Sequence, residues 1–422
     1  MIIKPKKSVH GTIEVPGDKS ISHRSIMFGS LADGKTTISH FLMGDDCVST
    51  INCFKALGID ITIDNDVVTV YGKGIRGLSK PSHILDCGNS GTTTRLLCGI
   101  LAAQDFTSTL TGDASIQKRP MKRVIEPLSQ MGAVIKAQDD NYCPLEISPG
   151  NLKGITYHSP IASAQLKSSL LLAGLYANEP TTVIEPNISR DHTERMLSAF
   201  GGKIKRSGKS VTVMPCTHFS PQHIEVPGDI SSAAYFIVAA LILEGSSLTI
   251  KNVGINPTRA GIIDVLTQMG GHIELTNQRI VCGEPVCDIA VKHSHLHGVT
   301  VSGPIIPSLI DEIPILAIAA AFASGTTVIK NAEELKVKES NRIDALYNEL
   351  TKMGVDITKL DDGLIIEGGS AIHGAEVDSN DDHRIAMSLA IVALKCTSDT
   401  LLTNASCIKI SFPNFFEILA TL

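Results

Sequence analysis

Apolar and polar positions along this chain follow a cycle that occurs six times. Each cycle has a strongly apolar run with the periodicity of a helix, then a turn, then a short strand rich in Thr and Ser. A second helix follows, and in five of the six cycles it ends in an apolar residue and a glycine, as at Leu57-Gly58. Repetition on this scale predicts an architecture built from copies of one unit. The apolar runs begin near Ser20, Thr92, Ala164, Ser231, Ile313 and Ile385.

The apolar runs are predicted to be core helices. Ala233 to Leu243 and Ile313 to Ala323 contain no charged residue, and a helix that is apolar on every side is buried in a protein interior or a membrane. Each run has about 11 residues, whereas roughly 20 are needed to cross a bilayer. Residues 1–7, MIIKPKK, also lack the apolar stretch of a secretory signal. We therefore expect a cytoplasmic protein that does not bind a membrane.

The composition supplies a large aliphatic core and excludes some partners. The 422 residues are 43% apolar and 19% charged, and none is Trp. The formal net charge of −6, with no basic tail, gives no reason to expect nucleic acid as a partner. The ten cysteines include no CxxC pair, so they predict neither a zinc site nor a redox site. Reduced structural thiols are the simplest interpretation.

A duplicated motif predicts the domain boundaries. The segment Glu14-Val15-Pro16-Gly17-Asp18 recurs at residues 225–229, in each case just before an apolar helix. Pro-Gly interrupts regular structure, so we interpret the two copies as crossovers between two domains. One domain then spans residues 17–226, and the other combines residues 1–16 with 227–422. Three cycles fall in each domain. The length of 422 residues also suggests two domains.

The N-terminal ends of the apolar helices carry polar and basic side chains. A helix N-terminus already has a positive partial charge, so basic residues there are disfavoured unless an anion compensates them. Several such ends together predict a site for an anionic small molecule, although ordinary caps and solvated helix ends are the alternative. The residues concerned are Lys19, Ser20, Arg24, Asn89 to Thr92, Arg95, Ser163, Gln165, Lys167, Asp311, Glu312 and Asp382 to Arg384.

One apparent phosphate-binding loop is predicted to be a coincidence. Residues 29–36, GSLADGKT, match the pattern GxxxxGK[ST]. That loop requires a strand before it and a helix after it. Here the preceding residues have a helical pattern and Thr36 to Ser39 have the pattern of a strand, so the context is inverted.

Six motifs, in their order along the chain, are specific enough to indicate a family. Together they closely resemble 5-enolpyruvylshikimate-3-phosphate synthase, and the resemblance covers essentially the whole chain. The motifs are GDKS with HR (residues 17–20 and 23–24), GNSGT (88–92), KRPM (118–121), SAQ (163–165), KESNR (338–342) and DHR (382–384). RDHTE at 190–194 and NPTR at 256–259 are similar to the family's second branch, which includes glyphosate-tolerant members.

The resemblance implies a fold and a reaction. Its fold class is α/β, an inverse α/β barrel in two domains of three βαβαββ copies each, whose buried parallel helices point toward an interdomain cleft. The implied enzyme, a glyphosate target, transfers the enolpyruvyl group of phosphoenolpyruvate to the 5-hydroxyl of shikimate 3-phosphate and releases phosphate. This is a step of the shikimate pathway of aromatic amino-acid and chorismate biosynthesis. We expect no cofactor, no metal and a monomer.

The family's functional residues map onto this chain through the same motifs and, for Asp311, through the segment Ile310-Asp311-Glu312. Asp311 is implied as the proton acceptor, Glu339 as a participant in proton transfer, and Lys19 as a catalytic residue that touches both substrates. The residues implied to bind shikimate 3-phosphate are Lys19, Ser20, Arg24, Ser163, Gln165, Asp311 and Lys338. Those implied to bind phosphoenolpyruvate are Lys19, Gly91, Arg119, Gln165, Arg342 and Arg384.

Some of these assignments have structural alternatives. Asp311 and Glu312 could simply cap the helix that follows them, Gly91 could be a turn glycine, and His383 could hydrogen-bond locally instead of moving a proton. The main branch of the family carries a lysine just before its C-terminal Phe-Pro, where this chain has Ser411. We predict that the nearby Lys409 lies in a strand, one position out of register, and points away from the site.

Two other functions compete with this one. The sister enzyme that transfers enolpyruvate to UDP-N-acetylglucosamine shares the fold but carries a catalytic cysteine beside its Arg-Pro, and no cysteine lies between Cys98 and Cys143 here. A non-catalytic repeat protein that binds an anion would not need the proton acceptor Asp311 together with Glu339 and Lys19.

Overall fold

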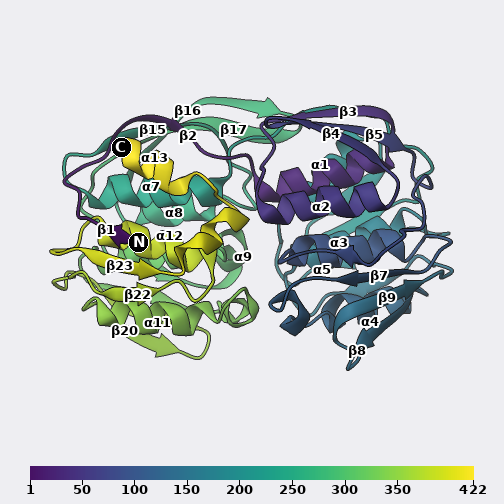
Figure 1. Ribbon diagram of the computed structural model, residues 1–422. Coiled ribbons are helices and arrows are strands. Elements are labelled where there is room, and N and C mark those ends of the chain that lie inside the picture. Colours follow the sequence, from purple (N-terminus) through teal and green to yellow (C-terminus); the bar gives the residue numbers. More distant parts are fainter. The chain divides into compact units, whose positions relative to one another are not determined.

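The computed structural model describes residues 1–422. The chain divides into two compact units, Gly17–Val226 and the combination of Met1–Pro16 with Pro227–Leu422. We call them the continuous unit and the split unit, and describe each by itself (Figure 1).

The continuous unit repeats one arrangement of helices and strands three times. Each copy has a buried helix, a second helix and a four-stranded sheet, and the sheet orders are β14-β3-β5-β4, β6-β7-β9-β8 and β10-β11-β13-β12. The helices are α1 (Lys19–Leu31), α2 (Asp45–Ala56), α3 (Gly91–Leu101), η1 (Ile116–Lys118), α4 (Lys122–Gln130), α5 (Ala164–Gly174) and α6 (His192–Ala199). The strands are β3 (Asp33–Ser39), β4 (Asp60–Asp64), β5 (Val67–Lys73), β6 (Leu85–Asp86), β7 (Ser108–Thr111), β8 (Val134–Gln138), β9 (Tyr142–Ser148), β10 (Thr156–His158), β11 (Thr181–Ile184), β12 (Ile204–Ser207), β13 (Ser210–Val213) and β14 (His223–Glu225).

The split unit follows the same plan with a shorter last copy. Its sheets have the orders β16-β17-β15-β2, β18-β19-β21-β20 and β1-β23-β22. The helices are α7 (Ile230–Ile242), α8 (Gly261–Gln268), η2 (Gly303–Ile305), α9 (Ile306–Leu309), α10 (Ile313–Ala321), η3 (Glu333–Val337), α11 (Arg342–Lys352), α12 (His383–Ala393), η4 (Ala405–Ile410) and α13 (Phe415–Thr421). The strands are β1 (Ile2–Ile3), β2 (His10–Glu14), β15 (Ser247–Gly254), β16 (His272–Val281), β17 (Glu284–Lys292), β18 (Thr300–Val301), β19 (Thr326–Ile329), β20 (Asp356–Leu360), β21 (Gly363–Glu367), β22 (Glu376–Asp378) and β23 (Thr400–Thr403).

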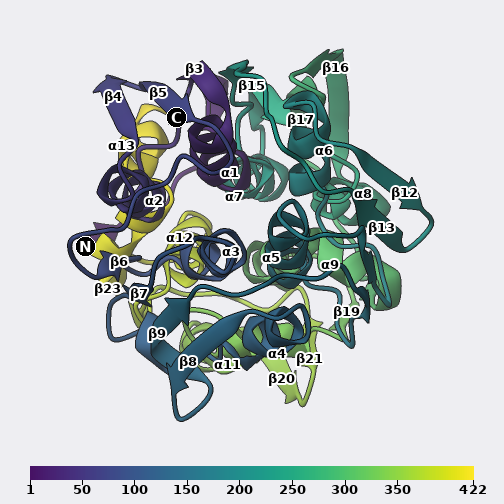
Figure 2. The same cartoon turned by 90° about the vertical axis from the view of Figure 1, so that its right-hand side faces the viewer.

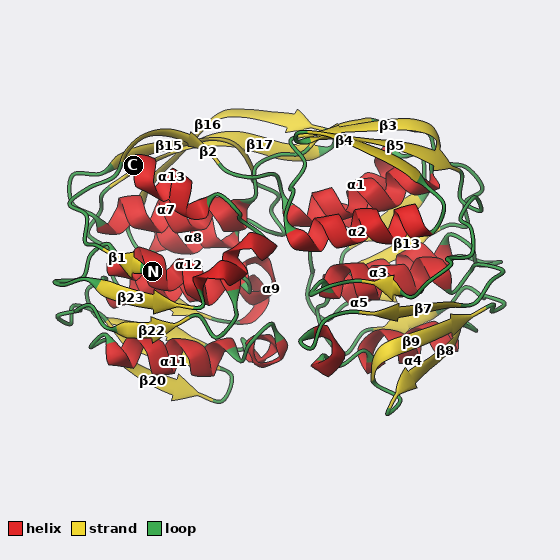
Figure 3. Ribbon diagram, in the orientation of Figure 1, coloured by secondary structure: helices red, strands yellow, loops and turns green.

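The mixed α/β fold predicted from the repeats is confirmed. The six apolar runs are α1, α3, α5, α7, α10 and α12, and α1, α3 and α5 run alongside one another, almost end-on in Figure 2. Strands lie on the outside of each unit and helices lie within (Figure 3). The inverted context of the GxxxxGK[ST] match is also confirmed, because Leu31 ends α1 and Lys35 lies in β3.

The strand that precedes each Pro-Gly-Asp segment pairs with a strand from a distant part of its own unit. The strand before the first segment, β2, pairs in parallel with β15 of the split unit, from His10 opposite Ser247 to Glu14 opposite Lys251. The strand before the second segment, β14, pairs in parallel with β3 of the continuous unit. Each sheet is therefore completed by a strand from a distant part of the sequence.

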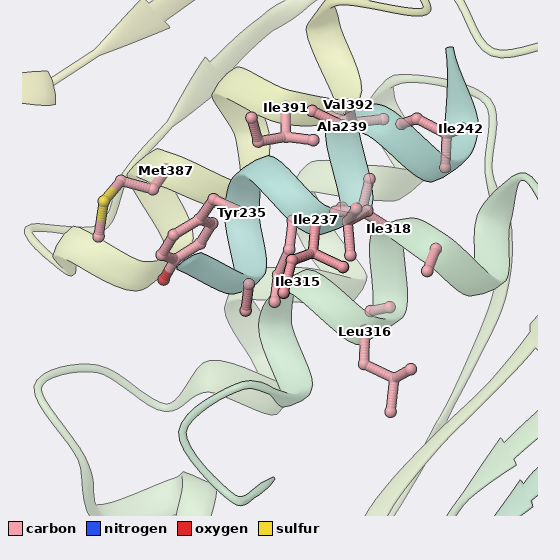
Figure 4. Close-up of a cluster of buried hydrophobic side chains, with 14 of the residues drawn as sticks. Tyr235, Ile237, Ala239, Ile242, Ile315, Leu316, Ile318, Met387, Ile391 and Val392 are labelled. Carbon is pink, nitrogen blue, oxygen red and sulfur yellow. The ribbon is translucent and has the colours of Figure 1, made fainter. Parts of the chain in front are cut away.

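The core of the split unit is made by three helices, of which α7 and α10 contain no charged residue and α12 carries Arg384 in its first turn. Every residue of α7 and α10 is buried, and side chains of α7, α10 and α12 meet in Figure 4, where Ile237, Ile318 and Val392 are labelled. The three helices belong to one hydrophobic cluster. No single helix has the length and apolar composition to cross a membrane, and one sharply bent pair, Gly303–Leu309 with Ile313–Ala321, passes that test by length and composition alone.

Five of the six core helices begin with a side-chain cap. An oxygen of Asp18, Ser90, Ser163, Asp229 or Asp382 accepts a hydrogen bond from a backbone N–H in the first turn of α1, α3, α5, α7 or α12. Such caps satisfy N–H groups that a helix leaves unpaired. The exception is α10, whose N-cap residue Glu312 makes no cap hydrogen bond.

We predict that Ile318→Ala lowers the free energy of unfolding of the split unit by about 2–5 kcal/mol, because the truncation leaves a cavity in a close-packed core. Ile318 is fully buried. The control Ile280→Ala, at a side chain that is 70% exposed, should change stability by less than about 0.5 kcal/mol. Urea unfolding followed by circular dichroism measures both, and equal effects would contradict the packing described here.

Candidate active site

The predicted site residues of the continuous unit lie at the N-terminal ends of α1, α3 and α5. Lys19 is the first residue of α1, and its ammonium contacts the buried carboxylate of Asp46 at the start of α2. Ser20 is the next residue and is partly exposed. The positive charge that the sequence places at this helix end is thus balanced by a carboxylate from the neighbouring helix.

Arg24, one turn further along α1, is held on several sides. Its Nε donates to Thr193 Oγ1 at 2.6 Å, its Nη2 to Ser168 Oγ at 3.0 Å and its Nη1 to the carbonyl of Ser20 at 3.0 Å. The hydroxyls of Ser168 and Thr193 are themselves 2.6 Å apart. The guanidinium therefore has a fixed orientation, set by side chains of α5 and α6.

A buried polar chain ties the first three helices together. His23 Nδ1 lies 2.7 Å from Thr50 Oγ1, which lies 2.7 Å from Thr93 Oγ1, and Thr93 donates to the cap oxygen of Ser90 at 2.7 Å. Burial, reinforced by the charges of Lys19 and Arg24, holds the pKa of His23 well below its ordinary value. The histidine is therefore neutral near pH 7, and the chain fixes α1 against the end of α3.

Gly91 begins α3 beside two guanidinium groups. A Cβ at this position would lie 2.9 Å from Arg95 Nη1 and 3.4 Å from Arg119 Nη1. Its backbone φ is not positive, so the reason for glycine is space and not backbone conformation. A side chain at residue 91 would therefore require the guanidinium of Arg95 to shift, whereas its distance from Arg119 would be that of an ordinary contact.

Arg119 and Gln165 complete this group. Arg119 Nη2 donates to Asn89 Oδ1 at 2.7 Å and to Ser115 Oγ at 3.0 Å. Arg95 Nη1 donates to Gln165 Oε1 at 2.6 Å, and the Gln165 amide donates to Thr92 Oγ1 at 3.1 Å. Ser163 caps α5 through Leu166 N at 3.4 Å. Donors from α3, α5 and the loop at residues 112–121 therefore gather around Gly91.

The predicted site residues of the split unit meet at one carboxylate. Asp311 Oδ1 lies 3.3 Å from Lys338 Nζ and 3.2 Å from Arg342 Nη1, and Oδ2 lies 4.0 Å from Arg384 Nη2. These cations come from two separate segments of the chain, residues 338–342 and the start of α12. Asp311 is thus surrounded by positive charge, which favours the ionised carboxylate that a general base requires.

Arg342 is the most completely paired of these cations. Its side chain is 1% exposed and donates from Nε to Asp382 Oδ2 at 2.8 Å and from Nη2 to Glu339 Oε2 at 2.7 Å. Burial by itself raises the pKa of Asp382, but the Arg342 charge outweighs it and holds this pKa below its ordinary value. A substrate anion that binds Arg342 must therefore share it with protein carboxylates.

Arg384 lies beside both acidic residues that precede α10. Its Nη1 donates to the carbonyl of Asp311 at 3.1 Å and lies 3.6 Å from Glu312 Oε1. The capping interpretation of Glu312 is wrong, because its side chain makes no cap hydrogen bond to α10. Asp311 lies among the cations Lys338, Arg342 and Arg384.

Two other expectations can be compared with the structure. Lys409 is exposed, as a residue that points away from the site should be, but the predicted strand is wrong because the segment is the 3-10 helix η4. His383 is buried at the start of α12. No group of three or more His, Cys, Asp or Glu side chains could hold a metal ion.

Several residues of these networks were not assigned from the sequence. Arg95 stood only among the polar helix ends, and Asp46, Asn89, Thr193 and Asp382 had no individual role. Their signal was present in part, since Asn89, Thr193 and Asp382 lie inside the motifs GNSGT, RDHTE and DHR. Asp46 lies in none of those motifs, and only the packing of α2 against α1 brings it to Lys19.

Comparisons with known proteins agree with this organisation. The family model described as EPSP synthase (3-phosphoshikimate 1-carboxyvinyltransferase) matches residues 3–419. The 3-phosphoshikimate 1-carboxyvinyltransferase of Thermoanaerobacter sp. (strain X514) is 56% identical over 415 residues, 98% of each chain. That of Brevibacillus brevis is 54% identical over 418 residues, 99% of this chain and 98% of its own.

Solved structures share the fold over the whole chain. EPSP synthase from Acinetobacter baumannii has a TM-score of 0.89 at 45% identity, covering 100% of this chain and 97% of its own. The enolpyruvyl transferase NikO from Streptomyces tendae has a TM-score of 0.81 at 17% identity, covering 100% and 96%, and shows the fold alone. The fold is that of the enolpyruvyl transferases.

Within that class, the chain belongs to the EPSP synthase family. It is accordingly a transferase of the shikimate pathway, as the six sequence motifs had indicated.

The paired charges of Asp382 and Arg342 predict a pH-dependent stability. The pKa of Asp382 is lower in the folded protein than in the unfolded chain, so the unfolded chain binds more protons in acid. The ionised carboxylate therefore stabilises the fold fully above its unfolded pKa near 4, and this stabilisation is lost as the pH falls through the lower folded pKa. We expect Asp382→Asn to lower the melting temperature at pH 7, by the equivalent of roughly 3–5 kcal/mol. The difference from wild type should shrink as the pH falls below about 4.

Calorimetry between pH 3 and pH 7 measures this difference. The control is Glu146→Gln, which removes the exposed ion pair with Lys136 and should cost less than about 1 kcal/mol. A difference that stays constant across the range would show that the charge of Asp382 is not its source.

Proposed function

We propose that this protein transfers the enolpyruvyl group of phosphoenolpyruvate to the 5-hydroxyl of shikimate 3-phosphate and releases phosphate. The observation that carries the proposal is the convergence of Lys338, Arg342 and Arg384 on the Asp311 carboxylate. A base beside several cations fits a reaction in which a hydroxyl loses its proton next to anionic groups. The relatives of more than 50% identity support the same reaction.

The proposed contacts with phosphoenolpyruvate use both groups of residues. Lys19, Gly91, Arg119 and Gln165 belong to the continuous unit, and Arg342 and Arg384 to the split unit. The planar guanidinium of an arginine can bind a carboxylate or phosphate through two parallel hydrogen bonds. Gly91 places no side chain between the end of α3 and the guanidinium groups of Arg95 and Arg119, so an anion bound by these groups could also approach the N–H groups of that helix end.

The proposed contacts with shikimate 3-phosphate are Lys19, Ser20, Arg24, Ser163, Gln165, Asp311 and Lys338. The fixed orientation of Arg24 on Thr193 and Ser168 supports its role, since a preoriented guanidinium loses less entropy on binding. Ser163 already caps α5, so its hydroxyl lies at that helix end.

The proposed chemistry needs a base and an acid. Asp311 would accept the proton of the attacking hydroxyl, and Glu339 would take part in protonating the methylene carbon of phosphoenolpyruvate, with Lys19 assisting. Glu339 Oε2 is 2.7 Å from Arg342 Nη2, which orients its carboxyl. Cations around both carboxylates would stabilise the charge of the tetrahedral intermediate.

The proposal extends to the setting of the enzyme. We infer that the units at residues 17–226 and at 1–16 with 227–422 are its two domains, that the protein is a cytoplasmic monomer, and that it needs no cofactor, metal, nucleic acid or membrane. Its substrates would be two small anions, and it would be a glyphosate target.

A phosphate-release assay tests the proposed reaction against its nearest alternative. Purified protein is mixed with phosphoenolpyruvate and either shikimate 3-phosphate or UDP-N-acetylglucosamine. Release with shikimate 3-phosphate alone is the expected result. Release only with the nucleotide sugar would assign the sister activity, and binding of phosphoenolpyruvate without turnover of either acceptor would favour the anion-binding protein.

Asp311→Asn and Arg119→Ala should separate catalysis from binding. Asp311→Asn removes the base and should lower kcat by about 10²-fold or more. Arg119→Ala should chiefly raise the KM for phosphoenolpyruvate, by about tenfold or more, because it removes a charge-assisted contact worth roughly 1.5–3 kcal/mol.

The matched control for charge is Lys409→Ala, at an exposed lysine of η4. It should leave the KM for phosphoenolpyruvate within about twofold, the scale of an exposed charge. Steady-state kinetics with each substrate varied measures all three variants. Near-normal kcat in Asp311→Asn would return the base to another group, and a tenfold rise in Lys409→Ala would bring Lys409 into the site.

A further inference from the structure

Glu312 occupies a position from which a helix is normally capped, yet it does not cap. It is the N-cap residue of α10, is 1% exposed, and makes no hydrogen bond to the first turn of that helix. Pro314 lies in that first turn and has no N–H to donate. A buried carboxylate is costly unless charges or donors surround it, so the side chain must be retained for another contact.

One oxygen of Glu312 lies among three donors. Oε1 accepts the hydroxyl of Ser231 and lies 3.6 Å from Arg384 Nη1 and 3.9 Å from Arg259 Nη1. Oε2 is buried and has no hydrogen-bond partner. Only Oε1 of the Glu312 carboxylate therefore faces the two guanidinium groups.

Arg259 is the fixed member of this arrangement. Its Nη2 donates to Asp229 Oδ1 at 2.9 Å and to Ser231 Oγ at 2.8 Å. Asp229 in turn caps α7 through Ser231 N at 2.8 Å. Because one side of Arg259 is held in this way, it and Ser231 define where Glu312 Oε1 can lie.

Arg384 is the adjustable member. Besides Glu312, its guanidinium contacts only groups of Asp311, the carbonyl at 3.1 Å and the carboxylate at 4.0 Å. If the charge of Glu312 were removed, Arg384 and Arg259 would face each other with one carboxylate fewer between them. Of these carboxylates, only Asp311 would then hold Arg384. The guanidinium of Arg384 would no longer be fixed in a single orientation.

We propose that Glu312, itself set in place by Arg259 and Ser231, is a positioning residue that fixes the orientation in which Arg384 receives an anion. The inference rests on the proposed function, in which Arg384 binds phosphoenolpyruvate. A guanidinium clamp gives affinity only when it is held in the binding orientation. Glu312 does not touch the substrate in this role.

The test compares Glu312→Gln with a matched buried glutamate. The substitution keeps the volume and a hydrogen bond to Ser231 but removes the charge. We expect the KM for phosphoenolpyruvate to rise about tenfold, with kcat within about threefold and the KM for shikimate 3-phosphate within about twofold. The control is Glu349→Gln in the same unit, where a buried carboxylate binds Lys352 and the backbone of Asp378; it should leave all three constants within about twofold.

A double-mutant cycle with Arg384→Ala distinguishes positioning from a general structural effect. If Glu312 acts through Arg384, Glu312→Gln should add less than about twofold to the KM once Arg384 is absent. Additive effects, or a wild-type KM in Glu312→Gln, would overturn the inference. If Arg384→Ala itself leaves this KM unchanged, the proposed role of Arg384 fails and the inference falls with it.

Arg259→Gln keeps the test available if Glu312→Gln does not fold. It removes the group that holds Glu312 and should raise the same KM, by about threefold or more, with the same loss of effect in the Arg384→Ala background. An unchanged KM in this variant would also overturn the inference.

Discussion

The structure depends on one constraint, which is that ionised side chains are buried at the N-terminal ends of apolar helices. A guanidinium or carboxylate removed from water is tolerated only if opposite charges and hydrogen bonds replace the solvent. The core helices contain no acidic residue, so every compensating carboxylate must come from a loop or from a neighbouring helix. Asp46 does this for Lys19, and Asp382 and Glu339 do it for Arg342.

In the split unit, the carboxylates that stabilise a buried arginine are also the groups proposed to transfer protons. The carboxylates that balance Arg342 include Asp311 and Glu339, the two groups to which we assign proton transfer. An arriving phosphate or carboxylate would compete with them for the same guanidinium. Binding of the anion would therefore loosen both carboxylates from Arg342 at the moment when they are needed as base and acid. The arginine would then serve as an exchangeable counter-ion.

Much of the fold could be predicted because its signals are local. The six core helices are recognisable from uninterrupted apolar runs, and their ends from Asp, Ser and Pro-Gly at the expected positions. Lys409 was placed in a strand because alternation over a few residues cannot be distinguished from a short 3-10 turn. The error is confined to a segment with no long apolar pattern to define it.

The candidate site was predictable only as far as single motifs reach. Arg119, Asp311 and Arg342 lie in recognisable sequence motifs, but several of the partners that orient them are distant in the chain. Asp46 and Thr193 acquire a role only when α2 and α6 pack against α1. Glu312 was misread for a related reason, because Asp or Glu before an apolar run is the usual signal of a cap, and the arginines that it faces lie 53 and 72 positions away in the sequence.

The long-range pairing of β2 with β15 has a consequence for synthesis on the ribosome. The continuous unit is complete once residue 226 has emerged, so it can fold while the remaining half is still being made, as domains commonly do. β2, although translated almost first, cannot pair until β15 appears more than 230 residues later. During that interval the backbone of β2 is unpaired, and an unpaired strand edge is open to pairing with other chains.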